Sequence, residues 1–334
     1  MGGCGRGTAT HREQTMDYSK AIDRLFTRQL RDWDVAGRNY GALGNVDVRT
    51  LELGQATVTL QYNPERRRSS AAAIDKQSLA SRACFLCSEH QPAKQKILLW
   101  GNHYKIQVNP YPIFRRHLTI ADLRHVPQRL SDRVGNMLQL ASTLPDFVIF
   151  YNGPQCGASA PDHAHFQAGA KGEMPLPEEL PHATTHMMAE GDEGFIGYVD
   201  TLGRSLFTIE TTTLRAAMRY AQRLLGMLPV PEGADEPMVN ALCWWNMTDR
   251  VWHMAIFPRR KHRPSCYGEG EGRLLLSPGA VDMGGLWAVP ERKDFDILTS
   301  ETVQSLYDEL CMNRHDLAAV INGFNQRWEE IQPI

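Results

Sequence analysis

The chain has 334 residues, of which 42% are hydrophobic and 22% are charged, and its formal net charge is −2. These proportions are typical of a globular protein with a large core. The near-neutral charge excludes a whole-molecule field that would favour nucleic acid or membrane, so we expect neither as a partner. No apolar run approaches the ~20 residues that a membrane-spanning helix needs.

The N-terminal segment and the cysteines indicate a cellular compartment. Residues 1–15 lack the apolar stretch of a signal peptide, and we expect them to form a mobile tail. The sequence has seven cysteines, an odd number. In a long chain without an export signal, this favours reduced thiols in the cytoplasm over a disulfide framework.

The first half is predicted to mix helices and strands. Residues 17–36 and 127–144 have the apolar spacing of helices. Alternating or continuous apolar residues predict strands over 56–64, 96–113 (two strands turning at Gly101-Asn102), 117–122, 147–153 and 164–170. Between them, the basic segment 64–73 is expected to be a loop.

The second half looks like a rerun of this pattern. Residues 241–260 predict a hairpin, and 213–228 and 299–331 predict helices. The segment 171–195, rich in Pro, His and Glu, is interpreted as the crossover between the halves. The fold class is therefore α+β, with antiparallel sheets and packed helices.

One short motif carries most of the chemical information. Residues 157–169 read GASAPDHAHFQAG, and on a strand His163, His165 and Gln167 share one face. The Gly-Ser loop before them can bind an anion through backbone N–H groups. A neutral imidazole suits attack on phosphorus, and an amide can hydrogen-bond a phosphoryl oxygen. A metal-only site, or two exposed histidines, is the alternative.

A second motif, CFLC, places Cys84 and Cys87 at the C-x2-C spacing of zinc sites. Two buried thiols without a metal are the alternative interpretation. Two further ligands must come from elsewhere in the chain. The histidines available for this are His90, His103, His117, His125 and His163.

Three stretches together resemble the galactose-1-phosphate uridylyltransferase branch of the histidine-triad (HIT-like) superfamily, which includes the diadenosine tetraphosphate phosphorylases and GDP-hexose phosphorylases. They are NPYPIFRRHLTIADLRH (109–125), YNGPQCGASAPDHAHFQ (151–167) and WHMAIFPRRKHRP (252–264). The resemblance implies HIT-like antiparallel sheets in two tandem halves, a catalytic one over 16–195 and a degenerate one over 196–334. It also implies that a homodimer is among the expected assemblies.

The resemblance implies covalent catalysis by His165 on the α-phosphorus of a nucleoside diphosphate sugar or dinucleoside polyphosphate. Phosphate or a sugar phosphate would then attack the nucleotidyl-histidine. Gln167 is expected to bond the non-bridging oxygens, Asn152 to hold the loop or the phosphate, and Gly157 and Ser159 to contact the phosphates. One extra residue, Asp162, separates Ser159 from the first His, so Asp162 is an insertion or a residue that orients an imidazole.

Some members of this branch carry a structural zinc, and the matching ligands here are Cys84, Cys87, His125 and His163. Cations should also converge on a diphosphate. Those we expect are Arg66, Arg67, Arg68, Lys105, Arg115, Arg116, Arg259, Arg260, Lys261 and Arg263.

Two rival functions remain open at this point. One is a hydrolase of the same superfamily, although hydrolases of that superfamily typically have a third His where Gln167 stands. The other is a zinc-stabilised protein that senses nucleotides without turnover. The Gly-rich segment 268–290 is expected to form a lid or a subunit contact, since its glycines match neither a P-loop nor a dinucleotide fingerprint.

Overall fold

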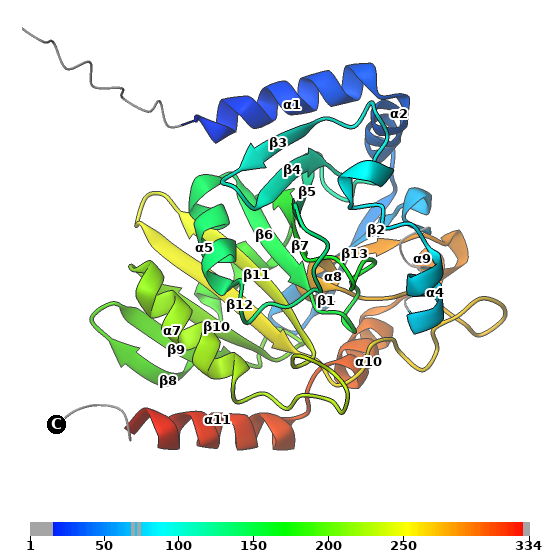
Figure 1. Ribbon diagram of the computed structural model, residues 1–334. Coiled ribbons are helices and arrows are strands. Elements are labelled where there is room, and N and C mark those ends of the chain that lie inside the picture. The colour runs from blue at the N-terminus through cyan, green and yellow to red at the C-terminus, as the bar shows by residue number, and fades with distance from the viewer. Residues whose placement is uncertain (1–15, 68–70, 72–74, 330–334) are drawn as a thin grey trace, which may run out of the picture.

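A computed structural model describes residues 16–67, 71 and 75–329 (Figure 1). The tail predicted over residues 1–15 and Arg68 lie outside the described residues. The dominant element is a ten-stranded antiparallel sheet with the order β3-β4-β5-β7-β6-β11-β12-β10-β9-β8. Its strands are β3 (Ile97–Trp100), β4 (Tyr104–Val108), β5 (His117–Asp122), β6 (Phe147–Asn152), β7 (His165–Ala170), β8 (His186–Gly191), β9 (Gly194–Val199), β10 (Leu206–Thr211), β11 (Val239–Asn246) and β12 (Val251–Pro258).

The strand order contains the same five-strand unit twice. Outward from the centre it runs β6-β7-β5-β4-β3 on one side and β11-β12-β10-β9-β8 on the other, so each strand has a counterpart five strands later. The two units join where β6 pairs antiparallel with β11, from Asn152↔Asn240 to Ile149↔Cys243. This arrangement agrees with two halves in tandem. The residue 195 boundary, however, falls inside β9.

Helices cover one face of the large sheet. These are α1 (Tyr18–Asp32), α5 (Val134–Thr143), α7 (Leu214–Leu225) and α11 (Arg314–Glu329). They share one buried cluster with inward residues of the strands, including Phe166 and Ala168 of β7. Figure 1 shows α1 along the β3 edge and α11 along the β8 edge. No described helix has both the length and the apolar character that a membrane crossing requires.

The opposite face packs against a second, smaller sheet and short helices. The sheet consists of β1 (Val48–Leu53), β2 (Ala56–Tyr62) and β13 (Leu286–Val289), and β13 runs parallel to β2. The helices here are α8 (Ala280–Met283), α9 (Arg292–Ile297) and α10 (Ser300–Leu310). Apolar residues fill the space between the two sheets, among them Phe150 of β6, Trp287 of β13 and Phe114, which lies between β4 and β5. The remaining elements are α2 (Asp34–Leu43), α4 (Lys76–Ser81), α6 (Leu176–Glu179) and the 3-10 turns η1 (Pro64–Arg66), η2 (Ser88–His90) and η3 (Leu180–His182).

Several predicted elements need correction. The helix expected over 17–36 breaks at Trp33, whose backbone is extended, and α2 then begins. The helix expected over 127–144 begins only at Val134. The supposed crossover 171–195 contains β8, and the Gly-rich segment 268–290 ends in β13, with Trp287 fully buried. Two of these segments depend on partners far away in the chain, since Gln128 N–H donates to Pro161 O and β13 pairs with β2.

Candidate active site

The site lies where β6 and β7 separate. The two strands pair up to Phe150↔Gln167 and no further. Beyond that point, β6 ends at Asn152 and the chain loops through Gly157 and Ser159 before β7 begins at His165. Since Phe166 and Ala168 are buried on the helical face, the alternation of a strand directs His165 and Gln167 to the other face.

His165 is buried, with 5% of its surface exposed, and its ring orientation is defined by one hydrogen bond. Its Nδ1–H donates to the carbonyl of His163 at 2.8 Å. This bond assigns the proton to Nδ1 and leaves the lone pair on Nε2, which has no hydrogen-bond partner among the described residues. Burial lowers the pKa of His165 to about 4, so the ring is neutral at pH 7. A neutral imidazole with a free Nε2 is a nucleophile.

The amide of Gln167 is held by two donors to its oxygen. His117 Nε2–H and Asn109 Nδ2–H donate to Gln167 Oε1 at 3.0 and 3.2 Å. The Nδ1 atom of His117 accepts the backbone N–H of Ile113 at 3.1 Å, which assigns the tautomer. Burial, with the charge of Arg66 as the next cause, lowers the pKa of His117 to about 3. Gln167 therefore keeps its NH2 group available for an anion.

Four of the residues named from the sequence form a cluster of metal ligands. The ligand atoms of Cys84, Cys87, His125 and His163 lie within 4.8 Å of one another. Sγ of Cys84 is 3.3 Å from His163 Nδ1, and Sγ of Cys87 is 3.2 Å from His125 Nδ1. Zinc with tetrahedral S and N ligands places such pairs about 3.5 Å apart, so the cluster has the dimensions and chemistry of a zinc site.

The surroundings of this cluster also suit a metal. His163 Nε2–H donates to the carbonyl of Asp122 at 2.8 Å, which turns its Nδ1 lone pair toward the thiols. Asp162 Oδ2 lies 3.6 Å from His125 Nε2 and its Oδ1 pairs with Arg82 at 2.9 Å. The two remaining histidines considered from the sequence near this motif, His90 and His103, lie outside the four-residue group.

The side chain of Asn152 connects the end of β6 to α8 and β11. Its Oδ1 accepts the N–H of Ala280 at 2.7 Å and the amide of Asn240 at 3.0 Å. Gly157 has φ +91°, and a Cβ there would lie 2.9 Å from the Cα of Gly279. The loop therefore packs backbone to backbone against the segment before α8. Ser159, in the same loop, is half-buried.

Two of the cations that were expected to bind substrate are buried and hydrogen-bonded to other groups of the protein. Lys105 is 1% exposed, and its Nζ donates to Ser88 Oγ at 2.9 Å and Gln91 Oε1 at 3.1 Å. Arg259 is 3% exposed and donates to Asn240 Oδ1 at 2.6 Å. Its other partners are the backbone carbonyls of Pro278, Lys261, His262 and Leu310. Arg259 thus joins β12 to the loop that contacts Asn152.

Four more of the expected cations, Arg67, Arg115, Arg116 and Lys261, lie at or near the surface. Arg67 pairs with Glu269 at 2.7 Å and with Glu291, and Lys261 pairs with Glu309. Arg116 pairs with Asp23 at 2.6 Å. It lies beside the C-terminal end of β7, whereas His165 lies at the N-terminal end of that strand. Arg115 is exposed, and its N–H donates to Glu173. Each of these four residues has an acidic partner elsewhere in the described part of the chain.

Two further residues bear on the site: Arg66, which is one of the expected cations, and Gln128, which the sequence did not single out. Burial lowers the pKa of Arg66 to about 10, its guanidinium donates to the carbonyl of Tyr111 at 2.8 Å, and its charge contributes to the lowered pKa of His117. Gln128 hydrogen-bonds the backbone of both β6 and β7. Neither residue has a recognisable motif: Arg66 is one of three adjacent arginines, and Gln128 lies in the segment 127–144 that was expected to be a helix.

Comparison with known proteins agrees with this architecture. Residues 25–170 match the family described as "Domain of unknown function (DUF4922)". The galactose-1-phosphate uridylyltransferase of Lactococcus lactis subsp. lactis (strain IL1403) is 28% identical over 141 residues, which cover 37% of this chain and 28% of the relative. That of Lactiplantibacillus plantarum is 25% identical over 174 residues, covering 47% of this chain and 34% of the relative. The chain therefore spans about a third of these relatives.

Solved structures of yeast Ap4A phosphorylase Apa2 match over a larger part of the chain. The complex with Ap4A has a TM-score of 0.56 at 16% identity and covers 86% of this chain and 97% of the yeast chain. The complex with AMP has a TM-score of 0.54 at 14% identity and covers 86% and 96%. The chain thus shares its fold with these solved structures, and part of its sequence is similar to galactose-1-phosphate uridylyltransferases.

Proposed function

We propose that the chain is a nucleotidyltransferase or phosphorylase that forms a covalent nucleotidyl-histidine at His165. The observation that carries the proposal is the orientation of the buried, neutral ring. With Nδ1–H donated to the His163 carbonyl at 2.8 Å, Nε2 is the atom that can attack. Its relatives in sequence and fold are named as a uridylyltransferase and as a phosphorylase bound to Ap4A and AMP, which supports a nucleotide substrate.

The first half-reaction forms one bond and breaks one. Nε2 of His165 attacks the α-phosphorus of a nucleoside diphosphate sugar or a dinucleoside polyphosphate. The P–O bond to the leaving sugar phosphate or nucleotide breaks, and its electron pair leaves with that group. As charge builds on the non-bridging oxygens, the Gln167 amide, held by His117 and Asn109, donates to them.

In the second half-reaction the acceptor attacks and His165 is the leaving group. An oxygen of inorganic phosphate or a sugar phosphate attacks the same phosphorus, the P–N bond breaks, and neutral His165 is regenerated. Because Nδ1 keeps its proton, the electron pair of the broken P–N bond returns to Nε2 and the imidazole leaves as a neutral ring, while the bond to the His163 carbonyl stabilises the positive charge of the adduct before it leaves. Zinc, when bound by Cys84, Cys87, His125 and His163, would fix His163, whose carbonyl accepts that bond.

Intact mass spectrometry tests the proposal. The protein is incubated with a panel of nucleoside diphosphate hexoses and dinucleoside polyphosphates, without any acceptor. We expect the mass to rise by one nucleotidyl group, and phosphate or a sugar phosphate to restore it. His165→Ala should form no adduct, whereas His182→Ala, which removes an exposed histidine in η3, should react like the wild type.

The same experiment distinguishes the rival functions. A hydrolase would lose the adduct to water at the same rate with and without phosphate. A nucleotide sensor would form no adduct with any compound, and His165→Ala would keep its affinity. Either outcome would contradict the proposed transfer reaction.

A further inference from the structure

The segment 126–130 fills the gap where β6 and β7 separate. Ordinary ladder pairing between these strands stops at Phe150↔Gln167, so the next residues toward the site have no partner strand on that side. The segment takes the place of that strand with its own backbone. Val126 O accepts the N–H of Ala164 at 2.7 Å, and the N–H of Gln128 donates to Pro161 O at 3.0 Å.

The side chain of Gln128 completes the connection. Its Oε1 accepts the N–H of His165 at 2.7 Å, and its Nε2 donates to the carbonyls of His165 and Asn152, both at 3.0 Å. Gln128 is 2% exposed, so these bonds do not compete with bulk water. A single carboxamide therefore binds both backbone groups of His165 and, at the same time, the end of the opposite strand.

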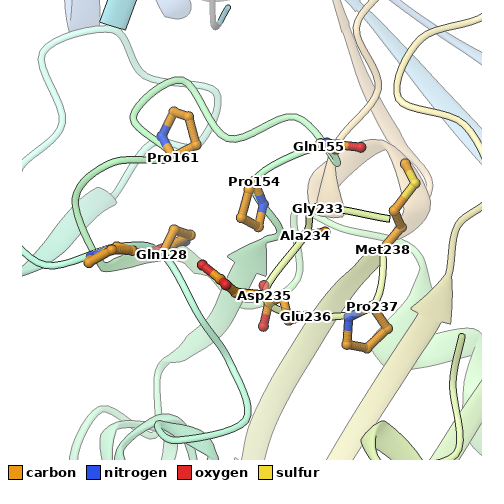
Figure 2. Close-up of a pocket in the computed structure, with 11 residues that line it drawn as sticks. Gln128, Pro154, Gln155, Pro161, Gly233, Ala234, Asp235, Glu236, Pro237 and Met238 are labelled. Carbon is orange, nitrogen blue, oxygen red and sulfur yellow. The ribbon is translucent and has the colours of Figure 1, made fainter. Parts of the chain in front are cut away.

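Packing does not hold this side chain on all sides. A cavity of about 180 Å³ adjoins it, lined by Pro127, Pro154, Gln155, Pro161 and residues 233–238. Figure 2 shows Gln128 at the margin of this space, with Asp235 and Glu236 between it and the 237–238 segment. On the side of the cavity the carboxamide has no packed neighbour among the described residues, and its three hydrogen bonds fix its orientation.

The segment itself is anchored on its far side. Glu236, 5% exposed, accepts the N–H of Leu130 at 2.6 Å and the hydroxyl of Tyr151, the residue before Asn152. Gln128 is thus placed by bonds to Pro161 and, through Leu130, to Glu236. It in turn determines the position of the His165 backbone.

We infer that Gln128 is the positioning residue for the nucleophile: its carboxamide spans the gap between β6 and β7 and holds the His165 backbone so that Nε2 points at the phosphorus. The inference rests on the proposed function for what His165 does, but not for how it is held. No other common side chain reproduces the set of bonds. Glu would place a carboxylate against two carbonyl oxygens, and Asn is one methylene too short to reach all three partners.

The test uses Gln128→Met, which keeps the length of the side chain and removes its hydrogen bonds, and Gln128→Asn, which keeps the amide. Gln139→Met on the exposed face of α5 is the matched control. Ap4A and UDP-glucose serve as reactive probes, one at a time, and AMP as a probe of binding. Adduct formation is followed in single turnover by intact mass, AMP affinity by calorimetry, and hydrogen exchange by mass spectrometry of peptides covering 163–168.

For both Gln128 variants we expect adduct formation to slow at least tenfold, while AMP affinity stays within about threefold. Exchange in 163–168 should accelerate at least tenfold, with little change elsewhere, and Gln139→Met should match the wild type. A loss of AMP affinity equal to the loss of rate would indicate general damage and overturn the inference. So would an adduct rate within twofold of the wild type.

The two proposals fail in different ways. If wild-type protein forms no adduct with either probe but exchange at 163–168 still depends on Gln128, the transfer reaction is wrong and the hold on the His165 backbone stands. If exchange is unchanged in both variants, the role of Gln128 is wrong whatever the activity.

Discussion

Replacing His117 by Phe separates the aromatic packing of this buried ring from its hydrogen bonds. Phe keeps the aromatic contacts with Phe114 and Phe150, whose centroids lie 5.4 and 5.8 Å away. It leaves the N–H of Ile113 without an acceptor, which costs about 1–3 kcal/mol for a buried donor, and it removes the bond to Gln167, worth about 1 kcal/mol. We therefore expect His117→Phe to lose about 2–4 kcal/mol of unfolding free energy at pH 7.

The pH dependence gives this prediction a sharper form. Burial lowers the pKa of His117 to about 3, below its ordinary value of 6.5, so between these pH values the unfolded chain binds the extra proton. Wild-type stability must then fall as the pH drops below about 6.5, by up to about 1.4 kcal/mol per unit. At about pH 4.5 this amounts to roughly 2–3 kcal/mol. The His117→Phe variant has no titratable side chain at this position, so its free energy of unfolding does not fall for this reason as the pH drops.

Urea denaturation of both proteins at pH 7 and at about pH 4.5 measures the effect. The stability gap between wild type and His117→Phe should shrink from about 2–4 kcal/mol to about 1 kcal/mol or less. His182→Phe, at an exposed position, should differ from the wild type by no more than about 0.5 kcal/mol at either pH. A gap that stays constant between the two pH values would refute the claim that His117 is kept neutral.

Three other perturbations have expected outcomes. Cys84→Ser should weaken zinc binding at least about tenfold in chelator competition and lower the Tm, whereas Cys266→Ser, outside the cluster, should not; equal zinc binding in both would exclude the four-ligand site. Gly157→Ala should cost about 1–3 kcal/mol in denaturation experiments, because φ is +91° and the new Cβ meets backbone; an unchanged midpoint would contradict this packing. Arg259→Met should cost about 3–5 kcal/mol, since it leaves buried carbonyls unpaired, and full stability would show that water replaces the guanidinium.

Much of the candidate site could be predicted because its geometry is local. On a strand, alternation alone brings His165 and Gln167 to one face and buries Phe166 on the other. Similarly, a C-x2-C pair brings its two sulfurs together wherever the chain folds. Cys84, Cys87, His125 and His163 also follow the order of the zinc ligands in the family that the sequence resembles, and the structure brings these four residues together.

What the sequence by itself determined about this protein is therefore the alternation of its strands, the α+β class and the residue types at the reactive centre. Tertiary structure decided the partners of two adjacent arginines: Arg66 donates to the carbonyl of Tyr111 at 2.8 Å, whereas Arg67 pairs with Glu269. It also kept residues 127–133 out of a helix, so that Gln128 could reach His165. The physical reason is that periodicity acts over a few residues, whereas a buried polar side chain is placed by partners tens of residues away.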